Sequence, residues 1–167
     1  MPSVLERARA AAETVVDPEL PMLTLADLGV LREVSLAEDG AVEIALTPTY
    51  SGCPALAEMR ADVVRRVRAE GIDGVRVRVE LDPPWSTDLI TEAGRAALAG
   101  AGLSPPGPTP RRDGPIPLRL SGIRRDARCP RCGSDDVRLI SEFGATACQA
   151  QYRCRSCLEP FDHMKEI

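Results

Sequence analysis

The stretch AVEIALTPTYSGCPALAEMRADVVRRVRAEGIDGVRVRVEL, residues 41–81, contains a predicted strand, loop, helix and second strand in that order. Apolar and charged side chains alternate over residues 75–81, a pattern typical of a half-buried strand. Between the two predicted strands, four apolar residues recur at the spacing of one helix face: Leu56, Met59, Val63 and Val67. Pro54 suits the first turn of this helix, because the N–H group that proline lacks would have no partner there.

The residues upstream extend this pattern. Segments 30–36 and 41–46 flank the turn sequence AEDG and predict a β-hairpin. Ser3 and Glu6 have the spacing of a capping box and predict a helix that runs to about Thr14. We therefore expect residues 1–100 to form an α/β (α+β) domain, with a small sheet of about three strands and helices on one face.

The composition favours an ordinary globular protein. The chain has 167 residues, of which 44% are hydrophobic and 3% aromatic, so a core of aliphatic side chains is expected. The first residues lack the apolar run of a signal peptide, and no stretch approaches the roughly 20 apolar residues of a membrane span. We expect a soluble, cytoplasmic protein with no membrane partner.

Charge is distributed unevenly along the chain. Residues 1–100 contain 17 acidic and 10 basic side chains, a net charge of −7, whereas residues 101–167 contain 8 acidic and 11 basic side chains, a net charge of +3. Four thiolates on a divalent ion would add about −2 to the second part and leave it almost neutral. The chain also has few aromatic residues on which bases could stack, so we expect no nucleic-acid partner.

Six cysteines without a secretory signal favour metal or redox chemistry over disulfide bonds. Four of them form two C-x-x-C pairs separated by 21 residues: Cys129, Cys132, Cys154 and Cys157. Two such pairs provide a tetrahedral set of four sulfurs, the geometry that Zn²⁺ prefers, although iron fits the same spacing. We expect a β-rich zinc ribbon over residues 128–167, a structural metal, and a proline- and glycine-rich linker over residues 101–127.

The other two cysteines are isolated in the sequence. Cys53 precedes Pro54 at the start of the predicted helix, where the helix dipole and unpaired N–H groups would lower the pKa of a thiol. It is either a reactive thiol or a buried structural cysteine. Cys148 lies six residues before Cys154 and is either a small buried hydrophobic residue or an auxiliary thiol that can exchange with the metal ligands.

Four motifs occur in a characteristic order: DPEL at 17–20, LADLGVLREVSL at 25–36, TPTYSGCP at 47–54 and DPPW at 82–85. Together they resemble the small domain of iron–sulfur assembly proteins of the Suf-associated and cytosolic-targeting types, over about residues 1–100. With the ribbon sequence CPRCGS…FGATACQAQYRC…CLEPFD, the whole chain resembles the PaaD family of accessory subunits of phenylacetyl-CoA epoxidase systems.

This resemblance implies a site made of Asp17, Glu19, Thr49 and Cys53, which would hold iron or an iron–sulfur cluster transiently. Acidic residues beside prolines can instead be solvated turn residues. Because a cluster generally needs four protein ligands, the single thiol of Cys53 requires help from a second copy in a homodimer, from a partner protein or from Cys148.

The resemblance also implies a function and partners. We expect a non-catalytic accessory or maturation subunit of the phenylacetyl-CoA epoxidase in aerobic phenylacetate degradation, whose partners are the other epoxidase subunits, including the iron–sulfur reductase. The alternative is a zinc-ribbon adaptor that holds the complex together without handling a metal cargo. An enzyme with Cys53 as nucleophile is disfavoured, because the sequence offers no histidine base near it and no oxyanion motif.

Overall fold

The computed structural model describes residues 1–50, 52–109 and 126–167, which form two compact units. The first unit comprises Met1–Trp85 and Leu89–Ala97, and the second comprises Ser86–Asp88 and Leu98–Ile167.

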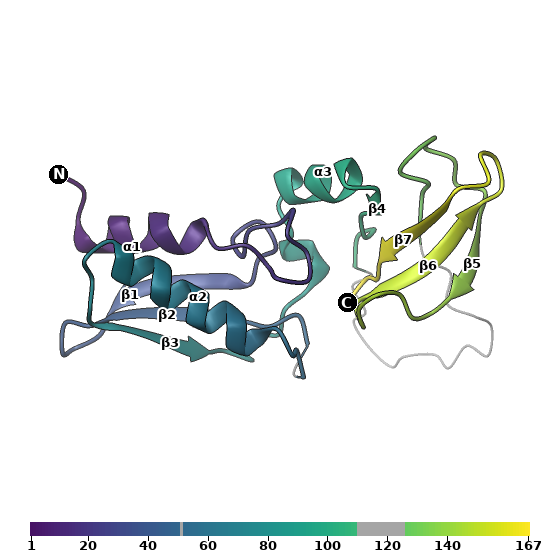
Figure 1. Ribbon diagram of the computed structural model, residues 1–167. Helices are drawn as coiled ribbons and strands as arrows, with labels where there is room; N and C mark the ends of the chain where they lie inside the picture. The colour runs from purple at the N-terminus through teal and green to yellow at the C-terminus, as the bar shows by residue number, and fades with distance from the viewer. Residues whose placement is uncertain (51, 110–125) are drawn as a thin grey trace. The chain divides into compact units, whose positions relative to one another are not determined.

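The first unit contains the predicted three-stranded sheet (Figure 1). Strands β1 (Leu31–Leu36) and β2 (Val42–Leu46) form an antiparallel hairpin. Strand β3 (Val75–Val79) pairs with β2 in parallel, so that the sheet order is β1-β2-β3. A parallel pair needs a crossover connection, and the helix after β2 provides it.

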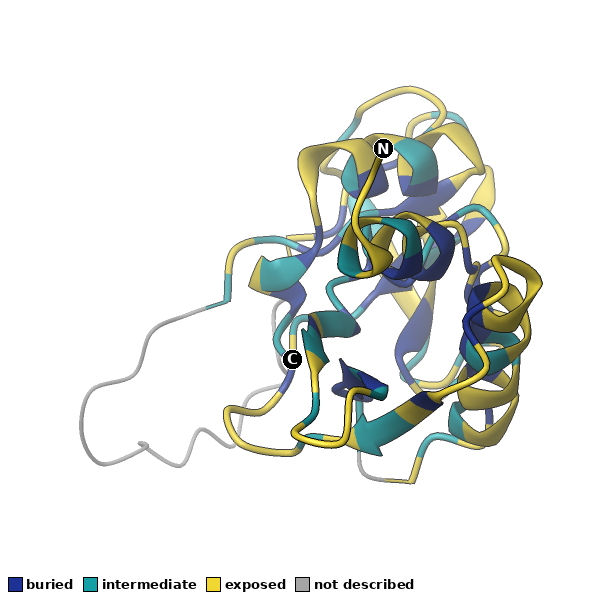
Figure 2. Ribbon diagram, turned by 90° about the vertical axis from the view of Figure 1, so that its left-hand side faces the viewer, coloured by how far each residue is buried: buried dark blue, intermediate teal, exposed yellow. Residues whose placement is uncertain are grey.

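Two helices lie side by side over this sheet (Figure 1). Helix α1 (Val4–Glu13) begins with the predicted capping box between Ser3 and Glu6, and α2 (Leu56–Ala69) is the crossover helix. Their buried residues are Ala8, Ala11 and Ala12 on α1, and Met59, Val63 and Val67 on α2. Figure 2 shows that each helix is buried along one side and exposed along the other. No helix among the described residues is both long enough and apolar enough to cross a membrane.

The segment after β3 returns to the loop before β1 and packs closely against it. The indole N–H of Trp85 donates to the carbonyl oxygen of Leu28 at 2.9 Å. A Cβ atom at Gly29, whose φ is +77°, would lie 2.6 Å from the Cβ atom of Leu89, and one at Gly94 would lie 2.9 Å from the carbonyl oxygen of Asp27. The motifs DPPW and LADLG therefore contribute to the packing of the first unit. The 3₁₀ turn η1 (Thr87–Leu89) and helix α3 (Glu92–Gly100) complete this segment.

The second unit is a four-stranded sheet in the order β4-β7-β6-β5. Its strands are β4 (Leu103–Ser104), β5 (Val137–Ser141), β6 (Gln149–Cys154) and β7 (Pro160–Met164). A small core cluster lies against it, formed by Ala127, Cys129, Ala150, Tyr152, Cys154 and Phe161.

This sheet changes the boundary of the expected linker over residues 101–127. Leu103 and Ser104 pair with β7, and Ala127 is buried in the core cluster. Both ends of the expected linker therefore belong to the second unit. The middle of the expected linker, residues 110–125, lies outside the described residues.

Candidate metal centres

Cys53 lies in the tight turn that connects β2 to α2. Its N–H group donates to the carbonyl oxygen of Tyr50 at 3.2 Å, and its own carbonyl oxygen accepts from the N–H of Leu56 at 3.3 Å. The half-buried thiol thus stands at the beginning of α2, as the sequence predicted. Helix α2 begins at Leu56, two residues later than Pro54 suggests.

The predicted direction of the Cys53 pKa is wrong. Burial is the largest influence and raises the pKa of the thiol, and the negative charges of Glu19 and Asp17 raise it further. The N–H groups of Ala55 and Leu56 act in the opposite direction but do not prevail. Desolvation and like charge both disfavour a thiolate. Cys53 therefore carries its proton in the metal-free protein at neutral pH.

Asp17 is buried, with 3% of its surface exposed, and is not a solvated turn residue. Its Oδ1 atom accepts hydrogen bonds from the N–H groups of Glu19 at 2.7 Å and Leu20 at 2.8 Å. Burial raises the pKa of Asp17 in spite of these two bonds. The carboxylate therefore closes a turn and is also costly to ionise.

Glu19 is half-buried, and burial together with the charge of Asp17 raises its pKa. The structure thus brings Asp17, Glu19 and Cys53 close enough for their charges to interact, although 36 positions separate Asp17 from Cys53. We refer to these three residues as the acidic thiol cluster. Each of its members has a raised pKa, so each binds a proton more readily than usual.

Thr49, the fourth expected site residue, lies half-buried in the same loop. Within the described part of the chain, no hydrogen bond joins it to the acidic thiol cluster. Its neighbour Thr47 is 1% exposed, and the Oγ1 atom of Thr47 has no hydrogen-bond partner among the described residues. A buried hydroxyl without a partner is uncommon. The sequence did not single out Thr47, because only its burial makes it unusual.

The four cysteines of the C-x-x-C pairs converge in the second unit, with all sulfur atoms within 4.8 Å of one another. The Sγ atoms of Cys129 and Cys157 are 3.6 Å apart, as are those of Cys132 and Cys154. A tetrahedral zinc ion with Zn–S bonds of about 2.3 Å places its sulfurs about 3.8 Å apart. The cysteines therefore fit a structural zinc ion that holds the ribbon together. Over residues 1–50, 52–109 and 126–167, no other set of three or more His, Cys, Asp or Glu side chains is placed to share one ion.

The two C-x-x-C turns have the same backbone form. In each, the residue after the second cysteine has a left-handed conformation: Gly133 with φ of +74° and Leu158 with φ of +64°. In the second turn the N–H of Cys157 donates to the Sγ atom of Cys154 at 3.4 Å. The N–H group of Cys157 is the largest influence on the pKa of Cys154, which is lowered to about 6. In spite of a backbone hydrogen bond that lowers it, the pKa of Cys132 is raised to about 12 by burial and the neighbouring thiols, so without a metal one thiol of the set is ionised at the expense of another.

Cys148 lies outside this set of four. It is 4% exposed, and its sulfur is 3.0 Å from the Oγ1 atom of Thr146. The single histidine, His163, is also not a metal ligand: it is fully buried, with ring nitrogens 3.1 Å from Ser104 Oγ and 3.1 Å from Glu166 Oε1. His163 on β7 thereby links Ser104 on β4 to Glu166.

Two protein families match separate parts of this chain. Residues 5–81 match the family described as "Iron-sulfur cluster assembly protein", and residues 114–165 match the "PaaD zinc beta ribbon domain". The two matches correspond to the unit that contains the acidic thiol cluster and to the unit that contains the four cysteines.

Relatives and a solved structure support both matches. An Escherichia coli K12 protein, named as a putative subunit of 1,2-phenylacetyl-CoA epoxidase, is 42% identical over 95% of this chain and 90% of its own length. A Porphyromonas gingivalis "Fe-S protein maturation auxiliary factor" is 35% identical over 47% of this chain and 75% of its own length. The crystal structure of a domain of unknown function, DUF59, from Bacillus anthracis aligns with a TM-score of 0.51 and 28% identity, over 57% of this chain and 91% of that one.

The E. coli relative matches across both units, whereas the maturation factor and the DUF59 domain each match about half of the chain. The chain therefore belongs to the PaaD family of phenylacetyl-CoA epoxidase subunits, and it combines an iron–sulfur cluster assembly domain with a PaaD zinc β-ribbon.

Proposed function

We propose that this protein is a non-catalytic accessory subunit of a phenylacetyl-CoA epoxidase, acting in the cytoplasm during aerobic phenylacetate degradation. Its task is to assist the assembly of iron or an iron–sulfur cluster in the epoxidase complex, with the iron–sulfur reductase as one recipient. The names of the relatives support the accessory role. The acidic thiol cluster is the observation on which the metal-handling role depends.

The chemistry of this cluster suits a transient cargo. A thiolate is a soft ligand for iron, so Cys53 is the ligand that we assign. Asp17 and Glu19 are not placed to share one ion with it in the metal-free structure, and their contribution is negative charge beside the thiol. Because burial and the neighbouring acids raise the pKa of Cys53, its thiol keeps a proton in the metal-free site, and an incoming iron ion must displace that proton. This competition weakens binding relative to a site of preformed thiolates and allows release. Thr49, in the same loop, is a further candidate to line the site.

One thiol does not complete the shell of a cluster. We therefore propose that the remaining ligands come from the recipient protein or from a second copy of this chain. The position of Cys148 makes it a weak candidate for this auxiliary role, because its buried sulfur already contacts Thr146 within the second unit.

The alternative is an adaptor that carries no cargo. The ribbon favours it in one respect: large apolar side chains are exposed there, with Phe143 76%, Leu158 61% and Ile140 51% exposed. Such residues are suited to contact with another protein of the complex. The adaptor predicts that zinc is the only metal the protein binds with any specificity.

Anaerobic loading with ferrous iron, with and without sulfide, separates the two functions. We expect wild-type protein to retain iron in addition to zinc, and Cys53→Ser to retain at least about ten-fold less iron with unchanged zinc, because the soft ligand is lost. Cys148→Ser is the matched control and should behave as wild type. Thermal unfolding of each variant, followed by the fluorescence of Trp85, confirms that the first unit remains folded.

The same variants are then tested for epoxidase activity in cells that lack the native copy. Loss of activity with Cys53→Ser but not with Cys148→Ser supports the maturation role. Equal iron retention by wild type and Cys53→Ser, together with normal epoxidase activity, would exclude it and leave the adaptor.

A further inference from the structure

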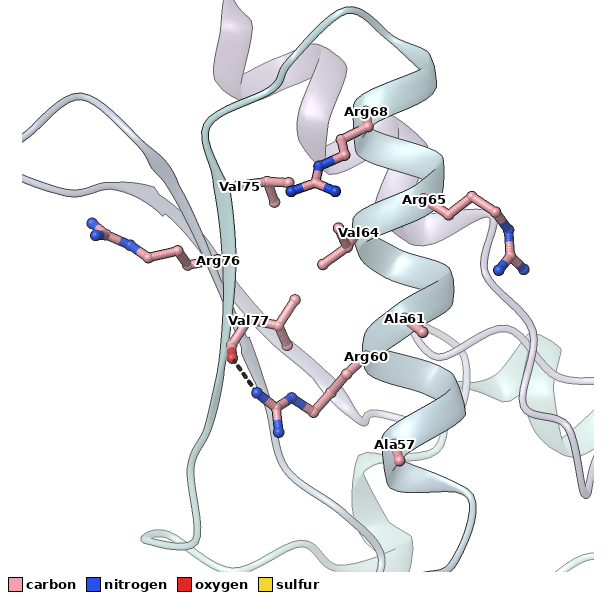
Figure 3. A pocket seen from close by; sticks show the side chains of 9 residues that line it. All are labelled: Ala57, Arg60, Ala61, Val64, Arg65, Arg68, Val75, Arg76 and Val77. Carbon is pink, nitrogen blue, oxygen red and sulfur yellow. Dashed lines mark hydrogen bonds between the residues drawn. The ribbon is translucent and has the colours of Figure 1, made fainter.

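A groove lies between α2 and the edge strand β3 of the first unit (Figure 3). Its volume is about 680 Å³. Small and apolar side chains line much of it: Ala57, Ala61, Val64, Val75 and Val77. The charged residues that line it are all arginines: Arg60, Arg65, Arg68 and Arg76. This groove lies on the first unit alone and includes no member of the acidic thiol cluster.

One wall of the groove is an open sheet edge. The carbonyl oxygen of Gly74 accepts from the N–H of Val42 at 2.7 Å, and the N–H of Glu80 donates to Leu46 O at 2.9 Å. Because backbone groups alternate in direction along a strand, the even-numbered residues from 74 to 80 face β2, and the odd-numbered residues between them face outward. The outward-facing backbone groups of β3, such as those of Val77, are where a further strand would pair.

Arg60 shows that this edge faces the groove. Its Nη2 atom donates to the carbonyl oxygen of Val77 at 3.3 Å, which is a long bond for N–H···O (Figure 3). Arg60 is exposed, so this contact can be exchanged for another donor with little loss. The N–H group of an added strand is such a donor, and its arrival would free the guanidinium for a carboxylate.

Carboxylates neutralise two of the four arginines that line the groove, and the other two give the groove its net positive charge. Arg65 pairs with Asp62, and Arg76 pairs with Asp39 at 2.8 Å; both side chains point away from the groove in Figure 3. Arg60 and Arg68 extend toward β3, and within the described ranges neither has a carboxylate partner. This positive charge is local, since residues 1–100 have a net charge of −7.

We propose that this groove binds an extended acidic segment of a partner protein, which joins the sheet as an additional strand beside β3. Strand addition uses the outward-facing backbone groups of β3, and the side chains on one face of the added strand meet α2. This inference does not rest on the proposed metal-handling function.

The helix sets the spacing of the acidic residues. Arg60 and Arg68 are eight residues apart on α2, or about 12 Å at 1.5 Å per residue, with Val64 midway between them. Residues four apart on a strand share one face and are separated by about 13 Å. The preferred segment therefore has acidic residues at positions i and i+4, with an apolar residue at i+2 facing Val64.

The arginines of the groove disfavour a second copy of this chain as its occupant, and the lack of lining aromatic side chains disfavours a nucleic acid. A second copy that paired edge to edge through β3 would bring the arginines of one groove against those of the other. A nucleic acid would find phosphate partners, but no aromatic side chain lines the groove for the bases to stack on.

The probe is the fluorescein-labelled heptapeptide TETVTET, titrated with the full-length, zinc-loaded protein and followed by fluorescence anisotropy. Its isomer TETVETT has the same composition but places the two acidic residues on opposite faces of a strand. We expect TETVTET to bind at least about five-fold more tightly than TETVETT, because only TETVTET aligns both carboxylates with α2. N-methylation of alternate amides that removes the donors facing β3 should weaken TETVTET to a similar extent.

Charge reversal identifies the site. Arg68→Glu should weaken TETVTET by about five-fold or more, whereas Arg66→Glu, an equal change on the same helix outside the groove, should change it less than about two-fold. The Trp85 thermal transition shows that both variants are folded. Equal binding of the two isomers, equal effects of the two substitutions, displacement of TETVTET by poly-U, or a wild-type dimer that Arg68→Glu dissociates would each overturn the proposal.

Discussion

Burial raises the pKa of Asp17 and of Cys53 in spite of hydrogen bonds that favour the charged form of each group. Two backbone N–H groups donate to the carboxylate of Asp17, and the N–H groups of Ala55 and Leu56 favour the thiolate of Cys53. The pKa of each group is nevertheless raised, and burial is the largest cause in both. A helix N-terminus therefore does not by itself activate a thiol when the thiol is desolvated beside two carboxylates.

The raised pKa of Asp17 gives a prediction for stability. A folded-state pKa above the unfolded value means that ionisation destabilises the fold: the stabilising effect of the protonated form is complete below the ordinary value of 3.8 and is lost as the pH rises through the folded pKa. Asn cannot ionise, and its Oδ1 atom can still accept from Glu19 and Leu20. We expect Asp17→Asn to raise the Tm of the first unit at pH 7 by about 2–5 °C.

Thermal unfolding followed by Trp85 fluorescence at several pH values provides the measurement. The gain in Tm should shrink as the pH falls through the folded-state pKa and disappear well below 3.8, where Asp17 is protonated in both states. The control is Glu13→Gln, since Glu13 is exposed on α1. A gain in Tm that persists at low pH would show that burial of the charge is not the cause.

At this scale, the resemblance to iron–sulfur assembly proteins implied Asp17 and Glu19, and Cys53 stands out in the sequence by its isolation. Neither the resemblance nor the isolation of Cys53 gives the electrostatics of these residues. The sign of the Cys53 pKa depends on how deeply the loop is buried and on two acids that approach it from 34 and 36 positions away. Local sequence contains neither quantity.

Among the elements, those with long or strongly marked patterns were predicted well. Local contacts, within a few residues, define the capping box of α1 and the hairpin of β1 and β2. The alternation in β3 arises because one face of that strand is exposed. Strand β4 was missed because two residues carry no periodicity, and its pairing with β7 joins positions about 60 residues apart. A proline-rich composition therefore concealed the start of the second sheet.

The two metal-binding turns differ at one informative position. Leu158 has the left-handed φ of +64° that Gly133 has in the other turn, and its side chain is 61% exposed. For a non-glycine residue the left-handed conformation costs about 1 kcal/mol of folding free energy, and the exposed side chain of Leu158 recovers little of this by burial. We expect Leu158→Gly to tighten zinc binding by about two- to five-fold, because the folded ribbon is the form that binds zinc.

Competition with a chromogenic chelator measures this effect. Gly133→Ala is the reciprocal variant: no atom lies within 4 Å of the added Cβ, so its cost is conformational alone, and zinc binding should weaken by about the same factor. Unchanged or weaker zinc binding by Leu158→Gly would mean that the exposed leucine makes a contact worth more than the backbone strain.

For the whole molecule, the division into two units separates metal-dependent from metal-independent folding. The second unit has a core cluster of six residues, and two of them, Cys129 and Cys154, are zinc ligands. The first unit contains the single tryptophan, Trp85, which is 5% exposed and hydrogen-bonded to Leu28. We expect zinc removal to unfold the second unit while the emission and thermal transition of Trp85 are unchanged.

Stepwise chelation under reducing conditions, followed by circular dichroism and by Trp85 fluorescence on the same sample, is the measurement. Readdition of zinc should restore the lost β signal. A red shift of Trp85 emission on chelation would instead show that the two units fold as one cooperative body.

The close packing around Gly29 and Gly94 also limits how this family can diverge. At both positions a single added carbon would lie within 3 Å of Leu89 or of the Asp27 carbonyl oxygen, and a Cβ atom at Gly29 would meet the backbone of Leu89 as well as its side chain. Rotation of a flexible side chain cannot relieve such an overlap. These two glycines should therefore change only together with the length or path of the facing loop, whatever the rest of the chain contains.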